Sequence, residues 1–200
     1  YIASGSLLGV TLAKTTSIPM GSIRKIRMFP LDFEEFVLAN GVNEYAIDAM
    51  RAKFEHLESL DESTHLKMLD LFRKYLLVGG LPDAVNTYIE THNIRRIREL
   101  QSETYEYYVA DASKYDAEHK LKIARIYDMI PSNLANKKKR VIAQKIEDKK
   151  GSRFSDYADE FDYLINAGIA LEVKAVSNPV YPLKESESKN LLKLYLNDVG

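Results

Sequence analysis

The chain has 200 residues, of which 46% are hydrophobic and 28% charged, a balance typical of a folded domain with its own core. Its formal net charge of −1 argues against a polycation that binds nucleic acid with its whole surface. The absence of cysteine excludes disulfides and thiolate metal sites, so we expect a cytoplasmic location. No apolar run reaches the ~18 residues of a membrane span, and we expect no membrane partner.

Both ends of the sequence look like interrupted structure. Residues 1–6 lack an initiator methionine and resemble the end of a buried strand followed by a turn. Residues 194–200 resemble a strand that leads into further structure. We therefore expect a fragment, whose first partner is the remainder of its own parent chain.

The first predicted elements are a strand and a helix. Residues 23–29 alternate apolar and basic side chains, which predicts a half-buried strand that stops at Pro30. Asp32 stands three residues before Glu35, which is the spacing of a capping box. A helix is therefore predicted from this point to Gly41.

Helical periodicity then continues through several segments, each with a plausible start signal. Gly79 and Gly80 interrupt the second of these segments, and residues 111–116 are the predicted linker to the C-terminal part of the chain. We expect the apolar stripes of these helices to form a core. The predicted helix starts are Asn43, Asp61 or Ser63, Pro82, and Asn93.

The last third of the sequence predicts helices followed by a hairpin. A helix from residue 118 should end at Pro131, and a second apolar stripe over residues 154–165 should end at Gly168. Residues 169–176 alternate as a strand, for which residues 180–183 are the predicted partner. Helices followed by a two-stranded ribbon indicate a winged helix, within a fold that is mainly α (α+β).

The sequence contains no P-loop, whose glycines and lysine hold nucleotide phosphates. Residues 5–9 are the nearest match, but they lack the lysine and are better interpreted as a strand-to-helix turn. The four histidines do not pair at helical spacing, so surface or capping roles are expected. We predict no catalytic residue and no metal site.

Glu172 and Lys174 share the Glu-x-Lys pattern of restriction-type nucleases, in which carboxylates hold Mg²⁺. The candidate acidic partners, Asp159 and Asp162, fall on the preceding predicted helix and not on a paired strand. The polar face of an amphipathic strand explains Glu172 and Lys174 more simply.

A basic stretch precedes the last of the three helices in the predicted winged helix. That helix itself carries four acidic residues, which a DNA major groove would repel. Non-specific backbone contact, protein docking or a solvated lysine face are the alternatives. The nucleic-acid-binding candidates are Lys137, Lys138, Lys139, Arg140, Lys149, Lys150 and Arg153, with Lys145 in the same stretch.

Several motifs in order resemble a known family. They are ASGSLLG at residues 3–9, MFPLDFEEF at 28–36, YLLVGGLPDAV at 75–85, DASKY at 111–115, YLINAGI at 163–169 and KLYLNDVG at 193–200. Together they resemble the prokaryotic AAA+ ATPase-like proteins related to archaeal ATPases, which carry a C-terminal nuclease-like domain of unknown function. The resemblance spans essentially the whole chain.

The resemblance implies four regions. Residues 1–30 would be a remnant of the AAA+ core, with the sensor-1 strand and the last strand, and residues 31–115 a helical lid region. Residues 116–185 would form the winged-helix domain, and residues 186–200 would begin the nuclease-like domain. The Walker A and Walker B motifs would precede this chain.

The resemblance also implies a set of site residues. Ser4 or Ser6 matches the sensor position, and Arg24 and Arg27 would be trans-acting arginines in a homo-oligomer. Since the nucleotide-binding lysine and the Mg²⁺ carboxylate are absent, ATP and Mg²⁺ would belong to the intact parent, with no cofactor in this chain. We expect a lid and winged-helix fragment without ATP hydrolysis; the alternatives are a winged-helix module that binds DNA non-specifically and a nuclease.

Overall fold

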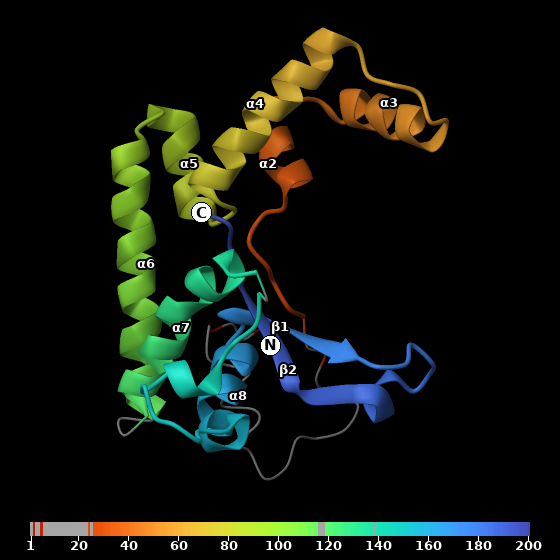
Figure 1. Ribbon diagram of the computed structural model, residues 1–200. Helices are drawn as coiled ribbons and strands as arrows, with labels where there is room; N and C mark the ends of the chain where they lie inside the picture. Colours follow the sequence, from red (N-terminus) through yellow and green to blue (C-terminus); the bar gives the residue numbers. More distant parts are fainter. Residues whose placement is uncertain (1, 3–4, 6–23, 25, 116–118, 138) are drawn as a thin grey trace. The chain divides into compact units, whose positions relative to one another are not determined.

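The computed structural model describes residues 2, 5, 24, 26–115, 119–137 and 139–200 (Figure 1). These residues form seven α-helices, three short 3-10 helices and one two-stranded antiparallel sheet, so the fold is mainly α (α+β), as predicted. The chain divides into two compact units. The helical unit comprises Arg27–Tyr105 and Asp198–Gly200, and the hairpin unit contains Glu106–Asn197.

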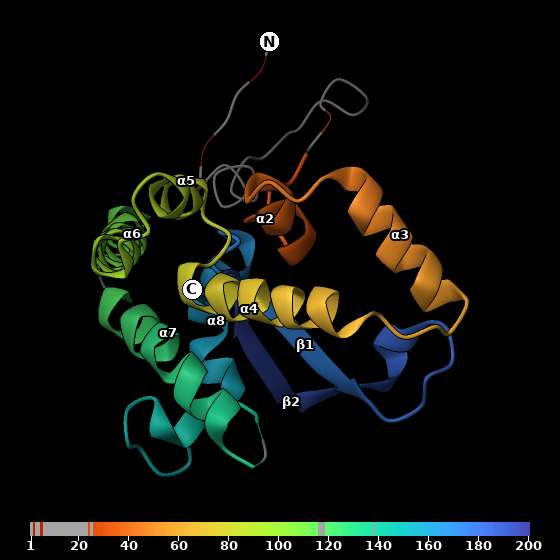
Figure 2. The same ribbon diagram turned by 90° about the horizontal axis from the view of Figure 1, so that it is seen from above.

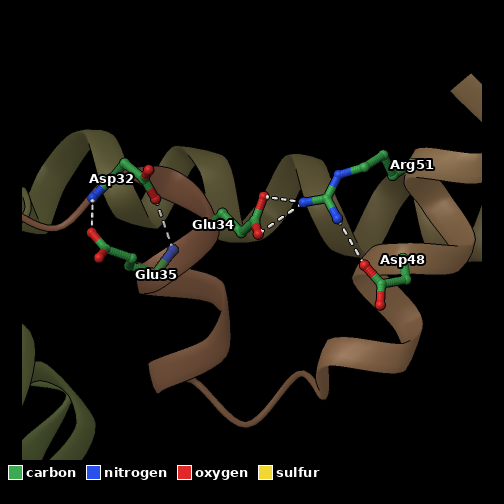
Figure 3. Close-up of polar contacts among 5 residues, drawn as sticks. All are labelled: Asp32, Glu34, Glu35, Asp48 and Arg51. Carbon is green, nitrogen blue, oxygen red and sulfur yellow. Dashed lines mark hydrogen bonds and ion pairs between the residues drawn. The ribbon is translucent and has the colours of Figure 1, made fainter. Parts of the chain in front are cut away.

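Capping side chains start the helices of the helical unit. Asp32 and Glu35 form the predicted capping box, with both backbone-to-carboxylate hydrogen bonds at 2.9 Å (Figure 3). Asn43 and Asp61 cap the next two helices through their own side chains, which confirms their predicted starts. The helices are α2 (Phe33–Ala39), α3 (Glu44–Glu55), α4 (Glu62–Val78), α5 (Pro82–Thr91) and α6 (Ile94–Tyr115), and the boundary between the units falls within α6.

Two small clusters of buried side chains hold the helical unit together. One joins α2, α4, α5 and α6 around Phe36, Val78 and Ile97, all of which are fully buried. The other joins α2, α3 and α4 through buried apolar residues, which are Val37, Ile47 and Leu71. At the surface, the Arg51 guanidinium links α3 to α2 through both carboxylate oxygens of Glu34 at 3.0 Å (Figure 3). Because this pair is half exposed, burial contributes most of the stability.

The chain end docks against the turn between α4 and α5. The Gly80 N–H donates to the Asp198 carboxylate at 2.6 Å, and the Gly80 carbonyl accepts from the Leu31 N–H at 2.7 Å. Gly79 has a φ of +77°, and a side chain there would collide with the Asp198 carboxylate. The Tyr75 hydroxyl donates to the Leu31 carbonyl, so this turn is fixed from two sides.

The hairpin unit packs two helices against the sheet (Figure 2). Its core contains Ile126 and Ile130 of one helix, Phe161 and Leu164 of the other, and Leu194 of the sheet, all buried. Strands β1 and β2 pair antiparallel, with Ala170 opposite Leu196. The elements are α7 (Lys120–Ala135), η1 (Ala143–Lys145), η2 (Phe154–Tyr157), α8 (Ala158–Asn166), β1 (Ala170–Val176), η3 (Leu183–Ser186) and β2 (Glu187–Leu196).

The predicted partner of β1 is wrong. Residues 180–183 do not pair with β1; its partner is β2, which lies in the segment assigned from the resemblance to the start of a nuclease-like domain. Pro179 and Pro182 explain the difference, because proline has no N–H to donate to a sheet. β2 has no proline, and its Leu192 and Leu194 side chains are buried at alternate positions.

Three other predicted boundaries also differ from the structure. The described residues of the segment 23–29 form no strand, since no neighbouring strand in the described chain pairs with them. Residues 111–115, within the predicted linker, belong to α6, because neither glycine nor proline interrupts that helix. Helix α7 continues through Pro131 to Ala135, since burial of the following turn outweighs one lost backbone hydrogen bond.

We predict that Gly79→Ala destabilises the chain by about 0.5–1.5 kcal/mol more than Gly41→Ala does, because the Asp198 carboxylate must move and loses its hydrogen bond to the Gly80 N–H. Both glycines have positive φ, at +77° and +85°, so both substitutions carry backbone strain. A Cβ at Gly41 meets nothing within 4 Å, whereas one at Gly79 collides with Asp198. Urea unfolding followed by circular dichroism measures both variants, and equal losses would contradict the assigned contact.

Candidate functional site

The basic stretch of residues 137–153 is held in place by its own apolar side chains. Val141, Ala143 and Ile146 are buried in the core of the hairpin unit. The Val141 N–H donates to the Leu192 carbonyl of β2 at 3.0 Å, which fixes the stretch beside the sheet. Exposed cations lie between and beyond these three buried residues, which we call the apolar anchors. The stretch is therefore a structured cationic surface.

Most cations of this stretch lack a carboxylate partner. Lys137, Lys139 and Arg153 are exposed, Arg140 is half-buried, and Lys138 lies outside the described residues. No carboxylate lies within 4.0 Å of the charged atoms of the described candidates, in so far as the structure describes the chain. The remaining exposed cations of the stretch are Lys145, Lys149 and Lys150.

The stretch also contains two acidic residues, and one of them has a structural role. The Glu147 carboxylate accepts from the Tyr157 hydroxyl at 3.0 Å and lies 3.6 Å from the Arg125 guanidinium. Burial raises the pKa of Tyr157, which keeps the hydroxyl protonated as a donor to Glu147. This contact ties the stretch to the residue that precedes α8. Among the described residues, no carboxylate pairs with the neighbouring lysines.

Helix α8 carries an acidic surface beside the cationic one. Asp156, Asp159 and Asp162 are exposed on η2 and α8, as the sequence indicated. Asp156 uses its carboxylate to accept from the Arg153 backbone N–H at 2.9 Å. Exposed carboxylates at these positions disfavour insertion of α8 into a DNA major groove.

Glu160 differs from the other acidic residues of α8, because only 1% of its side chain is exposed. Its carboxylate contacts His119 Nδ1 at 2.5 Å and lies 3.8 Å from Lys122 Nζ, which joins α8 to the start of α7. The sequence analysis counts Glu160 among the four acids that a DNA groove would repel, but its carboxylate is buried. Its position three residues after Tyr157 and four before Leu164 placed it on the apolar face, and that spacing was the available signal.

A groove of about 960 Å³ opens between α8 and the hairpin. Its floor is apolar and includes the buried Val141, Phe161 and Leu192. Its polar lining combines cations and anions from the basic stretch, α8 and both strands. These polar residues are Arg140, Gln144, Ser152, Arg153, Ser155, Asp162, Glu172, Lys174, Glu187 and Ser188.

Glu172 and Lys174 lie in this groove, but they form an ion-pair cluster. Lys174 Nζ is 3.4 Å from Glu172 and 3.5 Å from Glu187 on the neighbouring strand. Partial burial opposes the charged form of Lys174, yet the two carboxylates raise its pKa. Within the described chain, no three His, Asp or Glu side chains are grouped to hold a metal ion. The donor geometry therefore gives no support to the nuclease hypothesis.

The nucleotide-sensing candidates are not brought together in the described structure. Ser4 and Ser6 lie outside the described residues. Arg24 and Arg27 are exposed and belong to no helix or strand. These residues gain no geometric support as a site.

We predict that Glu160→Gln lowers the free energy of unfolding by about 1–3 kcal/mol, because the buried amide cannot replace the charge that faces His119 and Lys122. Asp159→Asn, the adjacent exposed acid on the same helix, should change it by less than about 0.5 kcal/mol. Thermal and urea unfolding of both variants test this difference. If the two substitutions cost the same, the buried contact does not stabilise the unit.

Comparison with known proteins identifies the family of the chain. No curated protein and no solved structure matches the sequence. A family profile described as a domain of unknown function, DUF8612, matches residues 69–200. The matched region is more than half of the chain and includes the basic stretch, α8 and the whole sheet. The chain therefore belongs to the DUF8612 family of domains of unknown function.

Proposed function

We propose that the hairpin unit is a winged-helix module that binds DNA mainly through phosphate contacts. The order of its elements supports this assignment: α7, the short η1, α8 and then the two-stranded ribbon. The hydrogen bond from Val141 to Leu192 also holds the segment between the helices against the edge of the ribbon. The loop between β1 and β2 would be the wing.

One observation carries the proposed function. The stretch 137–153 combines buried apolar anchors with cations that have no carboxylate partner among the described residues. A charge that is already paired contributes little to phosphate binding, whereas an unpaired lysine releases counterions from DNA. Because the anchors hold the backbone, these cations are presented from an ordered surface.

The acidic face of α8 limits the kind of DNA binding. Asp156, Asp159 and Asp162 would lie where a winged helix presents its recognition helix to the bases. Phosphates repel such a face, so contact through the basic stretch is favoured over insertion of α8. We therefore expect weak affinity, strong salt dependence and no reading of base pairs by α8 in the major groove.

The expected result is DNA binding that falls steeply with salt. In fluorescence anisotropy with a labelled DNA fragment, the logarithm of the binding constant should fall linearly with the logarithm of the salt concentration. The triple variant Lys145→Gln, Lys149→Gln and Lys150→Gln should flatten that slope by about 0.9 for each lysine that contacts a phosphate. At low salt, the triple variant should also bind the DNA fragment more weakly than the unmodified chain does.

A charge-matched control tests whether position or net charge matters. The variant Lys67→Gln, Arg73→Gln and Arg95→Gln removes three exposed cations from the helical unit. We expect it to retain the salt slope of the unmodified chain. Equal loss of binding in both triple variants, or binding that does not respond to salt, would overturn the proposed interface.

We also propose that this chain is the lid and winged-helix part of an AAA+ ATPase-like protein. Two features support this: the ordered motifs, and helices α2–α5, which occupy the range expected for the lid and share buried clusters. The nucleotide would then be held by the Walker motifs of the parent chain. Residues 5–9 contain two glycines but lack the P-loop lysine.

The purified chain should show no ATP turnover above a protein-free blank. Phosphoryl transfer depends on charge neutralisation by the P-loop lysine and a bound Mg²⁺, and the sequence encodes no motif that supplies them together. A phosphate-release assay with Mg²⁺ and ATP measures this directly. Hydrolysis that persists through successive purification steps would disprove it.

A further inference from the structure

Three charged side chains of the groove beside α8 form no ion pair with any residue that the structure describes. Arg140 and Arg153 line it without a carboxylate within 4.0 Å, and Asp162 lines it without a cation at that distance, among the residues that the structure describes. The remaining charges of the groove are Lys174 and its two carboxylate partners, Glu172 and Glu187, a cluster with a net charge of −1. A bound ligand would therefore meet two unpaired guanidinium groups and the Asp162 carboxylate, in a lining that is neutral overall.

The same groove offers an aromatic surface. Phe154 is half-buried at the start of η2, and its ring lies 5.8 Å from that of the buried Phe161. This contact holds the Phe154 ring in place from one side, while Phe154 also lines the groove. An aromatic ring and guanidinium groups that line one groove are the combination that binds bases and phosphates in single-stranded nucleic acid.

We propose that this groove binds single-stranded DNA and prefers bases with an exocyclic amino group. The inference rests on the proposed DNA binding and assigns its substrate class. Arg140 and Arg153 would contact phosphates, and Phe154 would stack on a base. The Asp162 carboxylate accepts hydrogen bonds, so it favours an amino group such as cytosine N4–H₂. Thymine lacks this group, and its O4 atom would face the carboxylate unfavourably.

Charge and size favour a single strand over a duplex. The exposed carboxylates of η2 and α8 disfavour insertion of this helix into the groove of a duplex. A single strand bends at each nucleotide and can place its phosphates on the arginines and its bases in the groove. The volume of about 960 Å³ is at the upper end of small-ligand pockets, so the groove has room for a short segment only.

Anisotropy with labelled oligo(dC) and oligo(dT) of equal length tests the preference. The unmodified chain should bind oligo(dC) about five-fold or more tightly than oligo(dT) at the same salt concentration. Asp162→Asn should abolish most of this difference, since a neutral amide presents a donor to O4 as well as an acceptor. Asp159→Asn removes the same charge from α8 outside the groove lining and should leave the difference intact.

Phe154→Leu tests the stacking contact. It should weaken the binding of both oligonucleotides about five-fold or more and leave the salt slope unchanged, because leucine keeps an apolar side chain but offers no ring face. Circular dichroism establishes that the variant is folded. If Phe154→Leu does not fold, the ratio of the affinities of Asp162→Asn for oligo(dC) and oligo(dT) still tests whether the groove binds the bases.

The outcomes separate this inference from the proposed function. Salt-dependent binding with equal affinity for oligo(dC) and oligo(dT) would overturn the groove assignment and leave phosphate binding by the basic stretch standing. Tighter binding of duplex than of oligo(dC) would likewise overturn it. An absence of binding to every DNA at low salt would overturn both. A preference for oligo(dC) that disappears only in Asp162→Asn would support the groove.

Discussion

The hydrogen bond between Val141 and Leu192 is the constraint on which the proposed site depends. It joins the basic stretch to a strand that lies about 50 residues further along the chain, and buried Val141 and Ile146 reinforce it. Without this attachment, the stretch would be a solvated loop with diffuse charge. Because the stretch is attached to β2, residues of the basic stretch and residues of the hairpin line the same groove.

The ion pairs of the hairpin unit distinguish charged side chains that stabilise the fold from those that are available to bind a ligand. Glu160 is buried against His119 and Lys122, so its charge serves the packing of α8 on α7. Lys174 is likewise committed to its carboxylate neighbours. The arginines that line the groove have no such partners among the described residues. Charge totals alone hide this distinction, since the chain as a whole is nearly neutral.

Local signals predicted the helices well and the hairpin poorly. Capping residues such as Asp32 and Asn43 act within three residues, so their effect is readable from the sequence. The partner of β1 depends on long-range pairing, and the proximity of residues 180–183 suggested the wrong strand. For the site, spacing identified the basic stretch and also places Glu160 on the apolar face of its helix. The contact of Glu160 with His119 and the approach of Glu187 to Lys174 depend on tertiary packing, which the sequence pattern does not show.

If the cations held by the attachment to β2 form a DNA-binding groove with the hairpin, a bound oligonucleotide must perturb those residues first. A titration of the ¹⁵N-labelled chain with oligo(dC), followed through the amide chemical shifts, locates the contact residue by residue. We expect shift changes concentrated in residues 139–155 and at Glu187 and Ser188, which line the groove or flank it. Changes concentrated in helices α2–α5, or no changes at saturating oligonucleotide, would show that the groove is not the binding site.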